Sequence, residues 1–319
     1  MTARTATEAR NATCVVADFE IAEIDVGDAA LLLDDHVPVD PKRLSRLSEL
    51  LLRAEPMLDR YRLADMPCTG LERSLAQAEV AYRGLDGTWP EATVSTALAW
   101  LQMLVVGAAE TCVALGQLAA DAARPLGIGP GSALARSVLE FSARAWWMAE
   151  LRIGPAERVG RMHSDWLYSS QQAERLAVAA DQADVLDGLS ATSDTVRGKA
   201  TLLGLSPLPD RPSSTALVAG VVGDTLYRPS SKIIYLDLSA KVHGTSFGVM
   251  QSFQRTEERV GKHRWLARRA DQRLIEGTCL PALLAYVAAV RRIVQLLGWG
   301  LVRIDAYQAS IEGFVYQSP

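Results

Sequence analysis

The segment from Tyr235 to Thr245, YLDLSAKVHGT, carries the residues of this chain best suited to chemistry. If it is helical, Tyr235, Ser239 and His243 lie on one face, because they are spaced four residues apart. A histidine can remove a proton at neutral pH, and a hydroxyl can be deprotonated or can donate a hydrogen bond to a substrate. We therefore expect these three to be catalytic residues. The alternative is a buried histidine that helix hydroxyls satisfy.

A second constellation places charges at the same spacing, with Arg136, Glu140 and Arg144 just before the pair Trp146-Trp147. One interpretation is a solvated stripe in which the glutamate bridges two arginines. The other is a charged ladder that binds an anionic substrate, with arginine as a bidentate clamp. In that second interpretation these three residues and His163 form the substrate-binding set.

A third feature is basic: a stretch near the C-terminal end concentrates arginine in a chain whose net charge is −4. Such a local excess could hold phosphates while an aromatic ring stacks on a base, as in RNA recognition. The alternatives are a solvated helix face or a contact between subunits. The candidate nucleic-acid-binding residues are Arg255, Arg259, Lys262, Arg264, Trp265, Arg268, Arg269 and Arg273.

Two resemblances bear on these features. Arg158 and His163 have the Arg-x4-His spacing that resembles the motif of the HEPN family, helical bundles that often cleave RNA, although Val159 stands where a polar residue is usual. That resemblance implies a ribonuclease using both side chains across a dimer. The helix ARSVLEFSARAWW, followed later by Leu-Ser-x-x-x-His-Gly, resembles uncharacterised all-helical bacterial proteins, and this implies a fold but no activity.

The composition limits the remaining classes. The chain has 319 residues, of which 49% are hydrophobic and 22% charged, as in a globular protein. Its four cysteines form no CxxC pair, which indicates reduced thiols in a cytoplasmic protein. No phosphate-binding loop, HExxH or dinucleotide motif is present, so we expect no cofactor and no metal. The apolar run at residues 93–109 is interrupted by Gln102 and flanked by acidic residues, which favours a core helix over a membrane span.

The elements that must position these residues are helices. Leucines recur at three- and four-residue spacing from Pro41, and prolines and glycines mark the ends of successive apolar segments. The pattern predicts an all-α multi-helix bundle, with an extended polar-aromatic tail after residue 302. The expected organisation is a loose N-terminal arm at 1–27 with a short strand, a main bundle at 28–204, a Pro/Ser-rich loop at 205–215 and a C-terminal helical region at 216–319.

These observations leave three hypotheses for function. The first is a cofactor-free transferase or hydrolase centred on His243, which transfers an RNA-linked activated acyl group, as in aminoacyl-tRNA, to a small-molecule acceptor. An aminoacyl ester needs only an oriented acceptor and a general base. The second is a HEPN-like ribonuclease, for which a homodimer is expected. The third is a non-enzymatic interaction or regulatory protein in which the polar stripes are structural.

Overall fold

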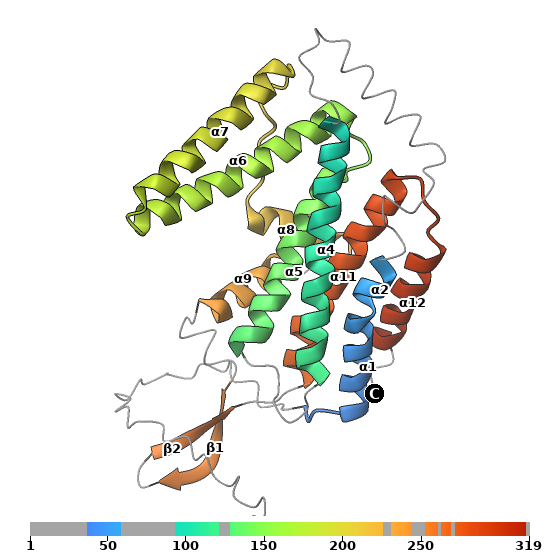
Figure 1. Cartoon of the computed structure of the whole chain (residues 1–319). Coiled ribbons are helices and arrows are strands. Elements are labelled where there is room, and N and C mark those ends of the chain that lie inside the picture. Colours follow the sequence, from blue (N-terminus) through green and yellow to red (C-terminus); the bar gives the residue numbers. More distant parts are fainter. Residues whose placement is uncertain are drawn as a thin grey trace, which may run out of the picture. The chain divides into compact units, whose positions relative to one another are not determined.

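The computed structural model describes residues 37–58, 93–120, 128–225, 231–243, 253–260, 263–268 and 272–316. Residues 36–319 belong to one compact unit, and the described residues of that unit are mostly helical (Figure 1). This confirms the predicted all-α multi-helix bundle. The described helices are α1 (Pro41–Leu52), α2 (Ala54–Leu58), α4 (Thr93–Ala120), α5 (Ile128–Met148), α6 (Pro155–Ala179), α7 (Ala183–Leu202), α8 (Ser214–Gly223), α9 (Ser231–Val242), α11 (Gln272–Leu296) and α12 (Val302–Tyr316).

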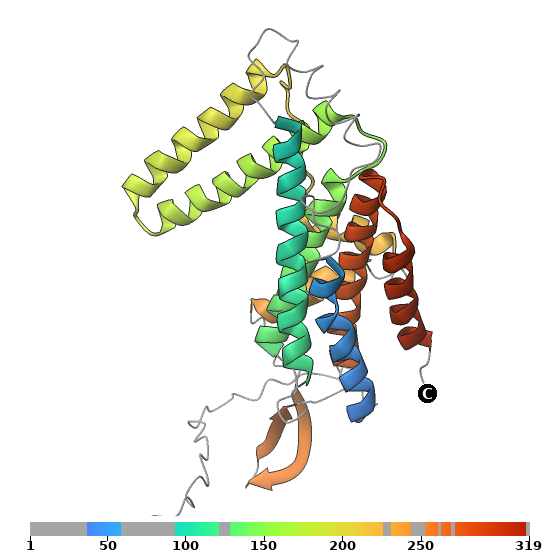
Figure 2. The ribbon, with the colours of Figure 1, turned by 45° about the vertical axis from the view of Figure 1, so that its right-hand side comes forward.

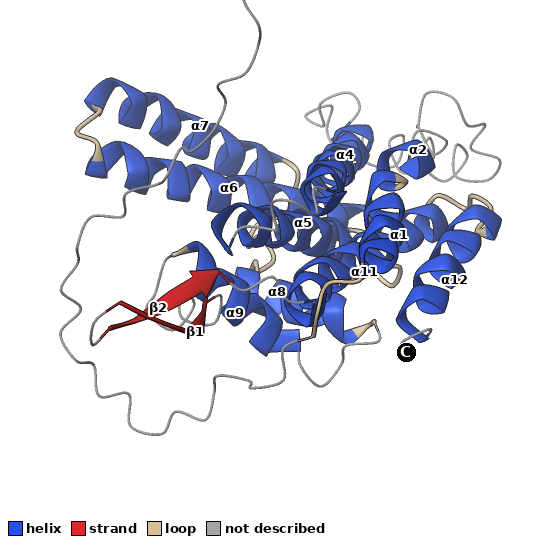
Figure 3. Cartoon of the chain, turned by 90° about the horizontal axis from the view of Figure 1, so that it is seen from below, coloured by secondary structure: helices blue, strands red, loops and turns tan. Residues whose placement is uncertain are grey.

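The centre of the bundle is formed by α4, α5 and α11, which pack against one another (Figure 3). Small residues let the helices approach closely, as where α1 crosses α4. A Cβ atom added at Gly116 would lie 2.9 Å from the Cβ of Leu51, and the Ser48 hydroxyl donates to the Gly116 carbonyl at 2.9 Å. Because both the packing and the hydrogen bond need this close approach, a side chain at position 116 would separate the two helices.

Two helices, α4 and α11, are long and apolar enough to cross a membrane by length and composition alone. In the most apolar window of α11, 67% of the residues are buried inside the protein, and in that of α4 the share is 44%. The buried residues of α11 include the large side chain of Tyr286, whose hydroxyl donates to the Ala54 carbonyl at 2.8 Å. Burial against other helices is typical of a core helix.

The helices that carry the candidate residues are arranged around α5. Both α8 and α9 pack on α5 and on each other, and α6 contacts α4 and α5 at its N-terminal part. The helices α6 and α7 form an antiparallel pair that leaves the bundle at an angle (Figure 2). The segment between α7 and α8 returns along α6, where Pro209 lies against Gly160. It overlaps the Pro/Ser-rich loop expected at 205–215, although α8 begins at Ser214, before the expected end of that loop.

Two expectations about local structure were wrong. The C-terminal tail is helical, not extended, because Ile304, Tyr307, Ile311 and Phe314 recur at helical spacing and form the buried face of α12. The basic stretch is not a helix either: it holds the antiparallel strands β1 (Phe253–Val260) and β2 (His263–Arg268). The sequence Gly261-Lys262 between the strands is a two-residue hairpin signal.

Several expectations fall on residues outside the described ranges. These are the N-terminal arm with its short strand and the basic residues Lys262 and Arg269.

Candidate functional site

Four of the predicted site residues meet where α5 packs on α9. The Arg136 guanidinium donates through Nη1 to His243 Nε2 at 3.1 Å and through Nη2 to the Tyr235 hydroxyl at 3.4 Å. Glu140 Oε1 accepts from Arg136 Nε at 2.9 Å and from the Tyr235 hydroxyl at 2.7 Å. The guanidinium also lies over the Tyr235 ring, 5.4 Å from its centroid. We call Arg136, Glu140, Tyr235 and His243 the α5–α9 site.

Helix geometry explains the pairing. On α5, Arg136 and Glu140 are one turn apart, and on α9, Tyr235 and His243 are two turns apart on the same face. Tyr235 is buried between the helices, whereas His243, in the turn directly after α9, is exposed. The side chains of Arg136 and Glu140 remain 24% and 35% exposed. A solute can therefore reach the charged groups while the tyrosine anchors them from beneath.

The protonation states in the α5–α9 site follow from these contacts. Burial raises the pKa of Tyr235, and the hydrogen bond to Glu140 raises it further, so the phenol stays protonated and donates. Burial by itself lowers the pKa of Arg136, but the hydrogen bond and charge of Glu140 outweigh it and leave that pKa raised. Because arginine only donates, His243 Nε2 must accept and the imidazole proton sits on Nδ1.

Ser239 is half-buried on α9 between Tyr235 and His243. It is linked to the histidine through the main chain, since the His243 N–H donates to the Ser239 carbonyl at 3.0 Å.

The third member of the charged ladder, Arg144, belongs to a different cluster. Its guanidinium forms a bidentate ion pair with Asp165 on α6, with Nη2–Oδ2 at 2.6 Å and Nε–Oδ1 at 3.0 Å. The Asp165 side chain is fully buried and also accepts from Arg211 Nε at 2.9 Å and from Trp100 Nε1 at 3.1 Å. Arg144 is therefore committed to an internal network, and it does not join Arg136 and Glu140 in one ladder.

The Asp165 carboxylate is ionised despite its burial. Burial by itself raises the pKa of Asp165, but the hydrogen bonds and charge of Arg144, together with those of Arg211 and Trp100, outweigh it and leave the pKa lowered. Arg211 comes from the segment between α7 and α8, and its guanidinium lies over the Tyr168 ring at 3.8 Å. Asp165 thus fastens that segment and α5 to α6. Sequence reasoning missed both Asp165 and Arg211, because 46 residues separate them.

Arg158 contacts the main chain at and beyond the end of α5. Its guanidinium donates to the carbonyls of Met148, Glu150 and Ile153, the last two at 3.1 and 3.2 Å. Burial lowers the pKa of Arg158 to about 10, which leaves it protonated at neutral pH. Since the last carbonyls of a helix lack partners within it, this arginine caps α5.

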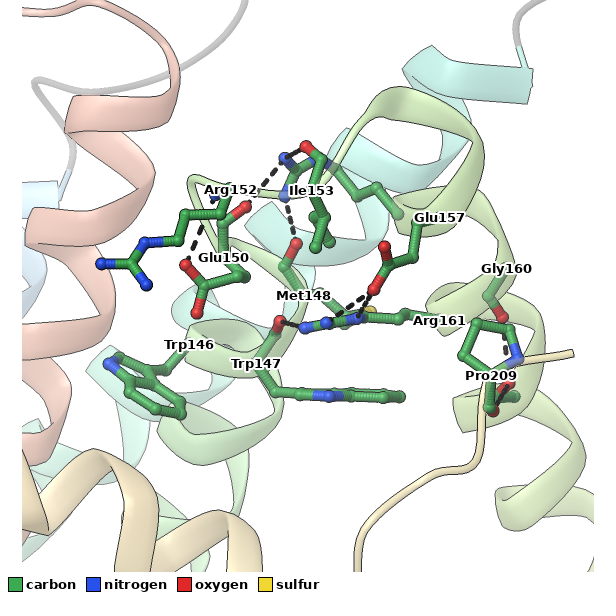
Figure 4. A network of polar contacts seen from close by, with 12 residues as sticks. Trp146, Trp147, Met148, Glu150, Arg152, Ile153, Glu157, Gly160, Arg161 and Pro209 are labelled. Carbon is green, nitrogen blue, oxygen red and sulfur yellow. Dashed lines mark hydrogen bonds and ion pairs between the residues drawn. The ribbon is translucent and has the colours of Figure 1, made fainter.

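Two further arginines converge on the same helix end. Figure 4 shows Arg161 beside Trp147 and Glu157: its Nη1 donates to the Trp147 carbonyl at 2.6 Å and its Nη2 pairs with Glu157 at 2.7 Å. Arg292 on α11 donates to the Trp146 carbonyl at 3.2 Å and lies 3.8 Å over the Trp146 ring. The negative end of the α5 dipole is therefore surrounded by cations.

His163 is buried on α6, with Nδ1 2.9 Å from the carbonyl oxygen of Val159 and its ring 5.8 Å from that of Trp166. Arg158 and His163 are thus both buried, and each is engaged with main-chain carbonyls near its own position. The resemblance to HEPN proteins rests on these two residues, and the geometry adds no support to it.

Burial makes His163 a source of pH-dependent stability. It lowers the pKa of His163 from 6.5, so the folded chain resists a proton that the unfolded chain takes up. The stability contribution is complete above pH 6.5 and is lost as the pH falls below it. We expect the substitution His163→Phe to reduce the decrease in unfolding free energy between pH 7 and pH 5, measured by urea denaturation.

The control is Trp166→Phe, which alters the same aromatic cluster without removing an ionisable group. An equal pH dependence in the His163→Phe variant and the wild-type protein would contradict this role for His163.

Of the basic stretch, the structure describes the backbone of the two hairpin strands and the exposed Arg273 at the start of α11. Among the described residues, no group of three or more His, Cys, Asp or Glu side chains is placed to hold a metal ion.

No family model, no curated protein and no solved structure matches the chain. The fold and the α5–α9 site define a helical-bundle protein with a partly exposed cluster of Arg136, Glu140 and His243 that packs over the buried Tyr235.

Proposed function

We propose that this protein is a cofactor-free enzyme that transfers or hydrolyses an activated acyl group at the α5–α9 site. The observation that carries the proposal is the contact between the accessible imidazole of His243 and the Arg136 guanidinium, with Tyr235 and Glu140 holding the arginine. An anion-binding group and an imidazole in direct contact are the minimum that general-base acyl transfer requires.

Arg136 has the role of binding an anionic part of the substrate. Two of its donor atoms, Nε and Nη2, are occupied by Glu140 and Tyr235, and these contacts orient the guanidinium plane. The third, Nη1, donates to His243. A substrate carboxylate or phosphate that accepts from Nη1 would replace the histidine there, because a charged acceptor makes the stronger hydrogen bond. Substrate binding then frees Nε2 of His243.

The freed Nε2 acts as the general base. The nucleophile, which is water or the hydroxyl or amine of an acceptor, transfers its proton to Nε2 and attacks the acyl carbon. The bond from that carbon to the leaving oxygen then breaks, and the leaving oxygen takes the proton back from Nε2. Glu140 and Tyr235 do not exchange protons in this scheme; they are positioning residues that hold Arg136.

The proposal predicts that turnover depends on both charge recognition and the imidazole. We expect purified protein to hydrolyse the p-nitrophenyl monoester of succinic acid faster than p-nitrophenyl acetate, because only the first carries an anion for Arg136. We expect His243→Gln to lower kcat by at least about 100-fold, the usual contribution of a general base. Release of p-nitrophenol, followed by its absorbance, measures both.

The matched control replaces a histidine elsewhere: His163→Gln removes an imidazole that is buried on α6. Arg136→Gln should raise KM for the succinyl ester and leave that for the acetyl ester unchanged. Turnover in the His243→Gln variant equal to the wild-type rate, or no turnover of either ester above the buffer rate, would sink the proposal.

A further inference from the structure

In the hairpin of β1 and β2, the arginine positions fall on one face of the two-stranded ladder. Cross-strand partners in an antiparallel pair lie on the same face of the ladder. The register pairs Phe253 with Arg268, Arg255 with Leu266, and Arg259 with Arg264. Since positions 264, 266 and 268 alternate with the other face along β2, these three pairs share one face. It carries four arginines, at positions 255, 259, 264 and 268, and we call it the arginine face.

The opposite face carries none of them. The pairs Gln254–Ala267 and Val260–His263 lie there, and Trp265 lies between their β2 members. The sequence alone suggested that Trp265 stacks on a base while the neighbouring arginines hold phosphates. In the register, Trp265 falls on the face opposite these four arginine positions.

The arginine face is unfavourable for the hairpin by itself. Arg259 and Arg264 stand directly opposite each other in the register. Like charges at such positions destabilise a ladder by roughly 0.2–1 kcal/mol. The two acidic residues of the hairpin, Glu257 and Glu258, fall where the register of β1 is irregular. With five basic and two acidic residues, strands and turn together carry +3 in a chain of net charge −4. A polyanion removes this repulsion.

We infer that the arginine face binds the phosphate backbone of RNA. Guanidinium groups suit phosphate because they donate two parallel hydrogen bonds to its oxygens. Positions 264 and 268 are about 13 Å apart along β2, at roughly 3.3 Å per residue, so the face extends along several phosphates. With no aromatic residue except Phe253 on that face, contacts go to the backbone and carry little sequence information.

The choice of RNA over DNA rests on the proposed function. Nine residues separate His243 of the α5–α9 site from Phe253 at the start of β1. A chain of that length spans at most about 35 Å, so the start of the hairpin lies within that distance of His243. An RNA held there could present an acyl ester on its terminal ribose to the site. The substrate class we assign is therefore an RNA-linked acyl ester.

The test is the fluorescence anisotropy of labelled total tRNA titrated with the full-length protein, beside a labelled 24-base-pair DNA duplex. For four phosphate contacts we expect the slope of log K against log salt to be about −3, at 0.7–0.9 for each contact. The double variant Arg264→Gln and Arg268→Gln should halve that slope to about −1.5 and weaken binding at low salt at least tenfold.

Two controls separate the arginine face from charge in general. Arg197→Gln with Arg303→Gln makes the same change in net charge on exposed positions of α7 and α12, and should leave the affinity within about twofold. The double variant Arg264→Lys and Arg268→Lys keeps the charge, and we expect it to retain most of the binding. If substitution at these two positions instead unfolded the hairpin, the lysine variant would lose binding as well.

Three results would overturn the inference: wild-type protein that does not bind tRNA below 10 µM at 50 mM salt, equal losses in the Arg264/Arg268 and Arg197/Arg303 glutamine variants, or DNA bound as tightly as tRNA. Ester hydrolysis by the wild-type protein is measured separately. Turnover without RNA binding would remove the RNA-linked substrate and leave the α5–α9 site proposal standing, whereas RNA binding without turnover would remove the enzyme and leave the arginine face.

Discussion

Replacing Asp165 by alanine is expected to lower the free energy of unfolding by about 3–5 kcal/mol, because removing one partner of a buried ion pair leaves the other charge uncompensated. Here two arginines lose their partner at once. The side chains of Arg144 and Arg211 are only 18% and 6% exposed, and both depend on the Asp165 carboxylate. The segment between α7 and α8 should also detach from α6. Urea denaturation measures the first effect and limited proteolysis of residues 203–213 the second.

The structure supplies a matched control for this change. Asp194 pairs with Arg197 at 3.1 Å on the surface of α7, where both side chains are more than half exposed. Asp194→Ala should cost less than about 1 kcal/mol, since exposed ion pairs contribute little. Adding Arg211→Leu to Asp165→Ala should restore part of the lost stability by removing one orphaned charge. If Asp165→Ala costs no more than Asp194→Ala, the carboxylate does not hold these elements together.

The second large effect concerns Arg158, whose replacement by methionine should lower the free energy of unfolding by about 3 kcal/mol. Three carbonyls at and beyond the end of α5 would lose their donor, and each buried acceptor left unsatisfied costs about 1–3 kcal/mol. Loss of a cation near the helix C-terminus adds up to about 2 kcal/mol. Methionine keeps the apolar volume, which offsets part of these costs.

Arg197→Met is the control, because Arg197 is exposed and touches a single carboxylate. The Arg158 variant also separates two interpretations of this arginine. A capping role predicts lower stability and a normal rate of ester hydrolysis in the fraction that remains folded. A variant that is as stable as the wild type would contradict the capping role. Loss of an RNA-cleaving activity from a variant of unchanged stability would restore the HEPN-like interpretation of Arg158 and His163.

The two kinds of polar cluster in this protein differ in the solvent exposure of their charged groups. In the Asp165 network the arginines pair with a buried carboxylate, and at the end of α5 they donate hydrogen bonds to main-chain carbonyls. At the α5–α9 site the charged groups stay partly exposed, and the His243 base is held by one hydrogen bond from Arg136. A group held so lightly at a surface can exchange its partner for a ligand, whereas Asp165 cannot.

The sequence by itself determined the helical bundle and the local pairs within it. Helical periodicity sets which residues share a face, so the pairing of Arg136 with Glu140 and the shared face of Tyr235 and His243 follow from spacing alone. The same periodicity was present in residues 304–314, and Gly261-Lys262 was present as a hairpin signal. Both local features could have been predicted from the sequence. The expectations of an extended tail and a helical basic stretch were therefore wrong for want of reading these signals.

Only the tertiary structure decided which faces meet. Arg144 has the same spacing from Glu140 as Arg136 has, yet α6 packs beside Arg144 and presents Asp165, while α9 packs beside Arg136 and presents His243. Spacing along one helix carries no information about the neighbour across the interface. That choice depends on how apolar faces from distant parts of the chain bury one another, and Arg211 joins Asp165 across 46 residues for the same reason.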